Sequence, residues 1–318
     1  MINPYEQIKT AVKNGKLTGS WLICGPYGVG KKDFVTRLCA YLTTGNWDAQ
    51  ISFHPDIKWI ERSLTEEEKK ETVKSILAGK AVEENTQRAR KKEITVDDIR
   101  EGLKFLSLKS SGTHLRILII NLADDMNENA ANALLKMLEE PNDNTLILLI
   151  CQNMGKLLPT IRSRCRKIMM RAKSEPELIN EIKNQIPHCK DVELLASLSE
   201  GSIGLAKDIY ANKGIELYQK MLSFMVPISQ MDIEKLSLFA DSFQKDEMAF
   251  SLLRVFISSW VSLRAKQECS KENLFAEEWL NLFDEINRLF NEVNSLYTDK
   301  KQTIMNVFFK ISQRLSND

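Results

Sequence analysis

The sequence has few of the features that mark secreted, membrane-spanning or metal-binding proteins. Its longest uninterrupted apolar runs, such as Leu146–Cys151, are far shorter than the ~20 residues that a membrane helix requires. The N-terminal stretch lacks the basic-then-apolar pattern of a secretory signal. The six cysteines are scattered, without the close spacing of a zinc site or a disulfide framework (Cys24, Cys39, Cys151, Cys165, Cys189 and Cys269). We therefore expect no membrane association, and free thiols in a reducing cytoplasm.

A strong excess of charge of either sign is also missing. The 44 basic and 43 acidic residues nearly cancel, which argues against a protein that binds nucleic acid alone through a broad basic face. With 318 residues, 43% of them hydrophobic, the chain is long enough for two or three domains with sizeable cores.

The stretch Trp21–Asp33, WLICGPYGVGKKD, joins an apolar run, a glycine-rich turn and the start of a helical pattern. This is the context of a phosphate-binding loop, in which backbone N–H groups and a lysine contact phosphate oxygens. The sequence predicts such a loop with Gly25, Gly28, Gly30 and Lys31 as its binding residues. The alternative is an ordinary glycine-rich turn between a strand and a helix.

Two parts of the expected magnesium site are missing. A working loop carries Ser or Thr after the Gly-Lys pair, and here Lys32 occupies that position. The strand predicted at Ile117–Asn121 should end in an acidic pair, and here it ends in Asn121-Leu122. Asp124 and Asp125, slightly further on, are interpreted as turn residues. Because two separate elements have lost their ligands, we expect no ATP hydrolysis by this chain alone, whereas nucleotide binding without hydrolysis stays open.

The order of secondary structure predicts an α/β domain followed by helices. Apolar runs predict strands that alternate with helices, which is typical of a parallel, doubly wound sheet. The predicted strands are Trp21–Gly25, Ile57–Ile60, Ile117–Asn121, Thr145–Cys151 and Arg166–Met170. Arg62–Glu93 is dense in charge and is interpreted as a peripheral insertion. From Ser174 onward every periodic segment is helical.

The segment Pro159–Arg164 is predicted as a loop or a single turn, and it carries Arg162 and Arg164. The two arginines have several possible roles. They can be solvated, they can pair with carboxylates of their own domain, or they can neutralise a phosphoryl group bound to a neighbouring subunit. The pattern alone does not choose between these roles.

Four motifs together carry a resemblance to a known family. They are GPYGVGKK (Gly25–Lys32), HPD (His54–Asp56), NENAANALLKMLEEP (Asn127–Pro141) and LLPTIRSRC (Leu157–Cys165). In this order they resemble the delta prime family of bacterial clamp-loader subunits, members of the AAA+ class that belong to DNA polymerase III. The resemblance covers residues 1 to about 208 well, and the helical remainder only in its class.

The resemblance implies a RecA-like AAA+ domain at residues 1–172, a three-helix lid at 173–212 and a helical collar at 213–318. It also implies a non-hydrolysing subunit of a DNA-directed DNA polymerase holoenzyme, a nucleotidyltransferase, with Arg164 as an arginine finger for the ATP of one adjacent motor subunit. The implied partners are the gamma/tau motor subunits, the delta subunit, the sliding clamp and, through the complex, primed DNA.

The chain departs from the family in two places. Many members carry a four-cysteine zinc module before the HPD, but no cysteine lies between Leu42 and His54, so we expect no zinc. Gly204 stands where the lid motif carries a phosphate-sensing arginine.

Two other functions are considered. The first is an ATP-hydrolysing motor subunit of the same loader or another AAA+ ATPase, which the loss of the acidic pair at Asn121-Leu122 argues against. The second is a small-molecule kinase, which the helical tail argues against.

Overall fold

The computed structural model describes residues 4–14, 17–49, 54–65, 68, 91–108, 115–270, 276–296 and 299–316. The chain forms two compact units, Met1–Lys173 and Ser174–Asp318. Most of the predicted insertion at Arg62–Glu93 lies outside the described residues. The further division of the helical part into lid and collar at residue 212 stays a prediction.

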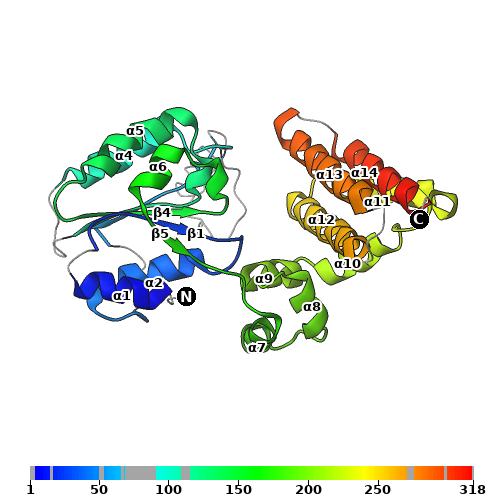
Figure 1. The fold of residues 1–318 in the computed structure, drawn as a ribbon, viewed down its shortest axis with the longest axis horizontal. Helices are drawn as coiled ribbons and strands as arrows, with labels where there is room; N and C mark the ends of the chain where they lie inside the picture. The colour runs from blue at the N-terminus through cyan, green and yellow to red at the C-terminus, as the bar shows by residue number, and fades with distance from the viewer. Residues whose placement is uncertain are drawn as a thin grey trace, which may run out of the picture. The chain divides into compact units, whose positions relative to one another are not determined.

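The first unit is built around a five-stranded sheet in the order β2-β3-β4-β1-β5, in which all neighbouring strands are parallel (Figure 1). The predicted doubly wound parallel sheet is therefore confirmed. Because all strands run in one direction, their carboxyl ends meet at one edge of the sheet. The strands are β1 (Gly19–Cys24), β2 (Ile57–Ile60), β3 (Arg116–Ile120), β4 (Thr145–Cys151) and β5 (Arg166–Met169).

Helices cover both faces of this sheet (Figure 1). The side chains of β4 alternate between two hydrophobic cores, as the period of two in a strand requires. Leu146, Leu148 and Ile150 pack in the core with α1 (Pro4–Lys13) and α2 (Lys31–Thr44). Ile147, Leu149 and Cys151 pack in the core with the helices of the opposite face, which are α4 (Val96–Leu106), α5 (Glu128–Glu139) and α6 (Pro159–Arg164).

Local signals set several boundaries of these elements. The Asn127 side chain accepts a hydrogen bond from the backbone N–H of Ala130 over 2.9 Å, so it caps α5. Two predictions are refined by the structure. Pro159–Arg164, predicted as a loop or a single turn, forms a six-residue helix, because Pro159 fits the first helical position and the buried Ile161 anchors the segment to the core. Strand β3 ends at Ile120, so Asn121 and Leu122 lie just beyond it.

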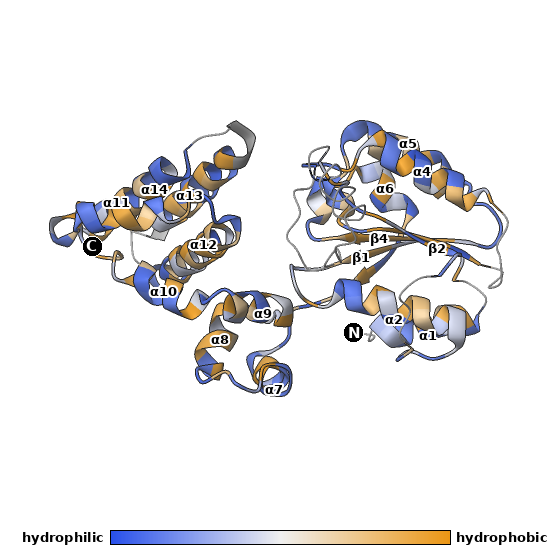
Figure 2. Ribbon diagram, turned by 180° about the vertical axis from the view of Figure 1, so that it is seen from behind, coloured by the Kyte–Doolittle hydropathy of each residue, from blue (hydrophilic) through white to orange (hydrophobic). Residues whose placement is uncertain are grey.

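The second unit is helical throughout its described part. Its eight helices share one hydrophobic core, and Figure 2 shows that they carry both hydrophobic and hydrophilic residues. The helices are α7 (Glu175–Gln185), α8 (Val192–Leu198), α9 (Ile203–Ala211), α10 (Gly214–Leu222), α11 (Ile233–Asp241), α12 (Glu247–Ser270), α13 (Ala276–Leu296) and α14 (Lys300–Leu315).

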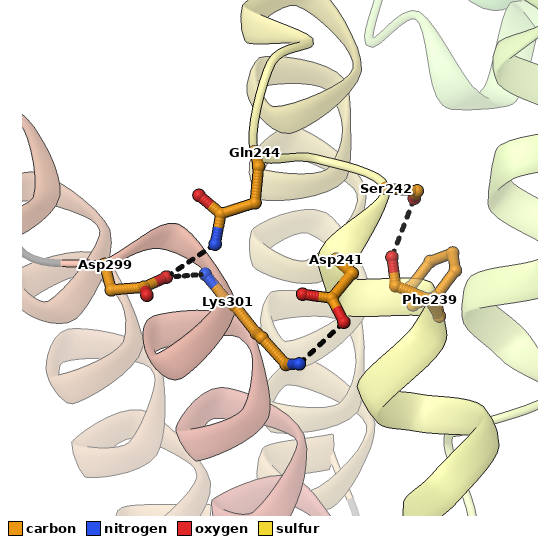
Figure 3. A network of polar contacts seen from close by, with 6 residues as sticks. All are labelled: Phe239, Asp241, Ser242, Gln244, Asp299 and Lys301. Atoms are coloured by element: carbon orange, nitrogen blue, oxygen red, sulfur yellow. Dashed lines mark hydrogen bonds and ion pairs between the residues drawn. The ribbon is translucent and has the colours of Figure 1, made fainter.

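Polar contacts fix the start of α14 against the elements before it (Figure 3). The Asp299 carboxylate accepts hydrogen bonds from the backbone N–H of Lys301 over 2.7 Å and from the Gln244 side chain over 2.9 Å. The Lys301 side chain pairs with Asp241 at the end of α11, with 2.6 Å between Nζ and Oδ2. These contacts join α14 to α11 and to the connection that precedes α12.

Among the described residues, one helix, α12, is long and apolar enough to span a membrane by length and composition alone. Its stretch Glu247–Cys269 has a mean hydropathy of 1.2. Several of its residues are buried in the core of the helical unit, among them Leu253, Phe256 and Ile257. A core helix of this kind meets the same criteria as a membrane span, so the helix is weak evidence for one.

Candidate functional site: a phosphate-type loop and an arginine on opposite edges of the sheet

The glycine-rich loop lies between β1 and α2, as the sequence predicted. Gly28 and Gly30 have φ angles of 70° and 91°, in the left-handed region that favours glycine. Gly30 is the N-cap residue of α2, and its carbonyl oxygen accepts the backbone N–H of Phe34 over 2.9 Å. The loop therefore leads directly into a helix N-terminus, the arrangement that binds anions in phosphate loops.

Gly25 is required by a neighbouring strand. A Cβ atom at this position would overlap the carbonyl oxygen of Met170, just after β5. The backbone N–H of Met170 also bonds to the Cys24 carbonyl oxygen over 2.7 Å, which holds the two segments together. The sequence assigned Gly25 to phosphate binding alone and missed this packing role, because the neighbour lies 145 residues away along the chain.

Lys31 is turned into the loop. Its Nζ donates hydrogen bonds to the carbonyl oxygens of Gly25 and Pro26, both over 2.6 Å, and only 6% of the residue is exposed. Burial lowers the pKa of Lys31, and the nearby Cys151, Asp124 and Cys24 partly oppose that shift. An incoming phosphate would therefore compete with two backbone carbonyls for this ammonium group.

Two buried cysteines lie beside the loop. Cys24 and Cys151 are register partners at the ends of β1 and β4, and their sulfur atoms are 2.9 Å apart. The hydrogen bond between them lowers the pKa of Cys24 and raises the pKa of Cys151, and either thiol can be its donor. All six cysteines are free thiols in the structure.

Lys32, an exposed cation, occupies the position where a Ser or Thr hydroxyl would bind magnesium. The Lys32 Nζ lies 5.5 Å from the centre of the Trp59 ring on β2, which is cation–π distance. Beyond β3, the Asn121 side chain lies 3.5 Å from the Glu61 carboxylate, and Leu122 has a φ of 58°. Neither Lys32, Asn121 nor Leu122 supplies a carboxylate or hydroxyl to a magnesium ion.

The two acidic residues that follow have structural partners. The Asp124 carboxylate accepts the backbone N–H groups of Gln152 and Asn153, over 3.1 Å and 3.0 Å, and so ties the turn after β3 to the end of β4. Asp125 pairs with Arg62 over 3.3 Å, and burial raises the pKa of its carboxyl group. Their interpretation as turn residues agrees with these contacts.

Arg164, at the end of α6, binds its own domain. Its Nη1 donates to the Thr160 carbonyl oxygen over 2.9 Å, and its Nη2 forms an ion pair with the Glu139 carboxylate at the end of α5. One third of the Arg164 side chain remains exposed. The Nε of Arg162 is buried and finds no hydrogen-bond partner in the described part of the chain. The structure therefore shows one of the roles that the sequence left open for Arg164, pairing with a carboxylate of its own domain. The sequence gave no signal that Glu139 is this partner.

The loop and Arg164 lie at opposite edges of the sheet. Strands β1 and β5 are parallel, with Trp21 opposite Arg166 and Cys24 opposite Met169. The loop follows the carboxyl end of β1, whereas Arg164 precedes the amino end of β5. The four residues of β5 alone separate the two edges by roughly 13 Å. Arg164 is therefore remote from a phosphate group bound at its own loop.

No group of three or more His, Cys, Asp or Glu side chains suited to a metal ion is found among the described residues. The interval before His54 in which the family's zinc module would stand is only partly described, because residues 50–53 fall outside the described ranges.

The family model described as DNA polymerase III, delta subunit, matches residues 3–174, which is nearly the whole first unit and more than half of the chain. The chain belongs to this family. The resemblance predicted from the sequence is therefore confirmed.

Relatives of this family agree with the match over shorter stretches. The chain is 45% identical over 74 residues to DNA polymerase III subunit delta' of Pseudomonas aeruginosa, which is 23% of each chain. It is 25% identical over 206 residues to DNA polymerase III subunit gamma of Buchnera aphidicola, covering 64% of this chain and 53% of the relative. The matched stretch spans about a quarter of the length of each of the first delta' relatives.

The fold of the whole chain is similar to a solved structure of the same class. A gamma subunit-related protein of DNA polymerase III from Thermotoga maritima matches with a TM-score of 0.50 and 19% identity over 98% of this chain and all of that chain. This confirms the predicted fold class, a RecA-like domain of the AAA+ type followed by helices.

Proposed function

We propose that this chain is a non-hydrolysing clamp-loader subunit of the delta prime kind, which presents Arg164 to ATP bound by a neighbouring motor subunit. The observation that carries the proposal is the placement of Arg164 at the edge of the sheet opposite to its own loop. A partly exposed guanidinium that is remote from its own nucleotide site can still meet a nucleotide bound by another chain.

The loop itself supports the non-hydrolysing part of the proposal. Lys32 places a cation where a magnesium ligand is expected, and Asn121 with Leu122 removes the acidic pair. Hydrolysis needs both the metal and a polarised water, so the loss of both ligand sets favours a subunit that assists turnover elsewhere. Nucleotide binding without hydrolysis is compatible with this role, and no zinc or other cofactor is required by it.

The proposed partners follow from the family. The chain would assemble in the cytoplasm with gamma/tau motor subunits and the delta subunit, and would act on the sliding clamp and, through the complex, on primed DNA. Its nearly balanced charge fits a subunit that meets DNA within an assembly better than one that binds DNA alone.

The decisive experiment replaces Arg164 in a reconstituted complex. An arginine finger contributes about 10³- to 10⁵-fold to turnover at the site it serves. Because one of several motor sites would face this chain, Arg164→Ala should lower the clamp- and DNA-stimulated ATPase rate only in part. Arg164→Lys should not restore it, because a point charge does not reproduce the planar fork of the guanidinium.

Arg162→Ala is the control on the same helix and should cost less than Arg164→Ala. Normal assembly of the Arg164→Ala complex, combined with wild-type ATPase and clamp-loading rates, would show that the chain is a scaffold and supplies no arginine.

The alternative, an ATP-hydrolysing motor subunit of the gamma kind, has one specific observation in its favour. The match to a gamma subunit extends over more of this chain than the matches to the first delta' relatives. The alternative requires hydrolysis by the purified chain, against which the Lys32 and Asn121-Leu122 positions argue.

A further inference from the structure

Arg164 and Glu139 form an ion pair between the ends of two helices. Glu139 is the last residue of α5, and Arg164 is the last residue of α6. The neighbouring Leu138 and Ile161 are buried in the same hydrophobic core, which sets the distance between the two helix ends. The ion pair therefore lies on a rigid base and not on a mobile loop.

The guanidinium is held at two points. Nη2 contacts the Glu139 carboxylate and Nη1 contacts the Thr160 carbonyl oxygen, so each terminal nitrogen has one partner. A guanidinium has five N–H donors, and these two contacts use two of them. With one third of the side chain exposed, Arg164 keeps donors for a phosphoryl group while its rotamer is restricted.

The ion pair with Glu139 could either hold the Arg164 guanidinium ready for a nucleotide or withhold it from one, and the strength of the pair distinguishes these two roles. About half of the Glu139 side chain is exposed, and exposed ion pairs of this kind change an equilibrium by about fivefold at most. The effect of an arginine finger on turnover is about 10³- to 10⁵-fold. So weak a pair does not withhold Arg164 from a nucleotide. It can, however, reduce the conformational entropy that the Arg164 side chain loses when it binds the nucleotide.

We infer that Glu139 is a positioning residue for Arg164, holding the guanidinium ready for a nucleotide bound by the neighbouring subunit. This inference rests on the proposed function, because it assigns Glu139 a role only through the arginine. In this role Glu139 acts on the nucleotide only through Arg164 and is not a catalytic residue.

The test uses the complete reconstituted complex and measures kcat and KM for ATP with clamp and primed DNA present. Glu139→Ala should lower kcat by about 2- to 5-fold, because the pair can contribute no more to positioning than its own strength. The loss should fall within the part of turnover that Arg164→Ala removes. KM should stay unchanged if ground-state binding of ATP depends on the motor subunit. Glu139→Gln keeps a hydrogen-bond acceptor for Nη2 and should restore part of the loss.

The matched control is Glu140→Ala. Glu140 is the adjacent, exposed residue, and no ion pair is found for it within the described part of the chain. Its replacement should leave kcat at the wild-type value.

A double-mutant cycle separates positioning from a general structural effect. In the Arg164→Ala background, Glu139→Ala should cause no further loss. An equal loss in both backgrounds would overturn the inference, as would faster turnover by Glu139→Ala, which indicates sequestration. If Arg164→Ala lowers turnover and Glu139→Ala does not, only this inference is wrong. If Arg164→Ala has no effect, the proposed function and the inference fall together.

Discussion

The side-chain nitrogen of Lys31 lies 2.6 Å from the carbonyl oxygen of Gly25, six residues earlier in the same loop. The lysine that the sequence assigns to phosphate binding is thus held by the loop's own backbone. Because this ammonium group is also buried, its protonation is linked to the stability of the fold.

The pKa of Lys31 is lowered from 10.5 by burial, which has a defined consequence for stability. Between the lowered pKa and 10.5 the unfolded chain binds more protons than the folded chain. The free energy of unfolding should therefore rise with pH across this interval, relative to a Lys31→Met variant that cannot titrate. Chemical denaturation at several pH values up to about 10.5 measures the difference.

Lys32→Met is the matched control for this prediction, because Lys32 is adjacent but exposed. It removes a neighbouring lysine charge without removing the buried ammonium group. A difference between the wild type and Lys31→Met that does not change with pH would show that burial of Lys31 carries no linkage to folding.

The missing magnesium ligands can be restored in one variant. Lys32→Thr, Asn121→Asp and Leu122→Glu together should strengthen ATP binding in the presence of magnesium by about tenfold, equivalent to about 1.4 kcal/mol. Turnover should stay at background, because Gly204 stands where the predicted lid would need a phosphate-sensing arginine. ATP affinity with and without magnesium, together with an ATPase assay, measures both effects.

The wild-type chain serves as the reference for this variant and should show no ATPase activity above background. Turnover by the purified wild-type chain that Lys31→Ala abolishes would contradict the non-hydrolysing interpretation.

Two glycines of the loop should differ in their tolerance to alanine. Gly25→Ala should destabilise the fold by about 3 kcal/mol or more, because the new Cβ would overlap the Met170 backbone, which cannot move without shifting β5. Gly30→Ala should lower the free energy of unfolding by about 1–2 kcal/mol. The new Cβ would meet no other atom, so the only cost is that alanine disfavours the φ of 91° at this position. Equal losses in denaturation experiments would show that β5 adjusts freely.

The charged insertion should be dispensable for folding. The backbone N–H of Lys91 bonds to the carbonyl oxygen of Ser63 over 2.7 Å, so the two ends of the insertion lie side by side. Replacing residues 66–90 with a short Gly/Ser linker should change the melting temperature by less than about 3 °C, corresponding to roughly 1 kcal/mol.

The flanking contacts Arg62–Asp125 and Ser63–Asp98 remain in that variant and should keep both ends in place. Co-purification with the other loader subunits tests assembly at the same time. A larger fall in melting temperature, or loss of the complex, would mean that the insertion packs against the protein.

Much of the fold and part of the site could be predicted from the sequence, because the signals are local. The bounds of β2 and β4 agree with the predicted strands, since the apolar pattern of a strand is set within a few residues. The loss of metal ligands at Lys32 and at Asn121-Leu122 is likewise a matter of residue type, and needs no tertiary contact to be recognised.

The tertiary structure decided the contacts between residues that are distant along the chain. Three such contacts join different strands or helices. They are the close approach of the Met170 backbone to Gly25, the sulfur contact of Cys24 with Cys151, and the ion pair of Arg164 with Glu139. Such contacts depend on strand order and register, which local periodicity does not specify. For the same physical reason, only the placement of β5 beside β1 puts Arg164 at the edge of the sheet away from its own loop.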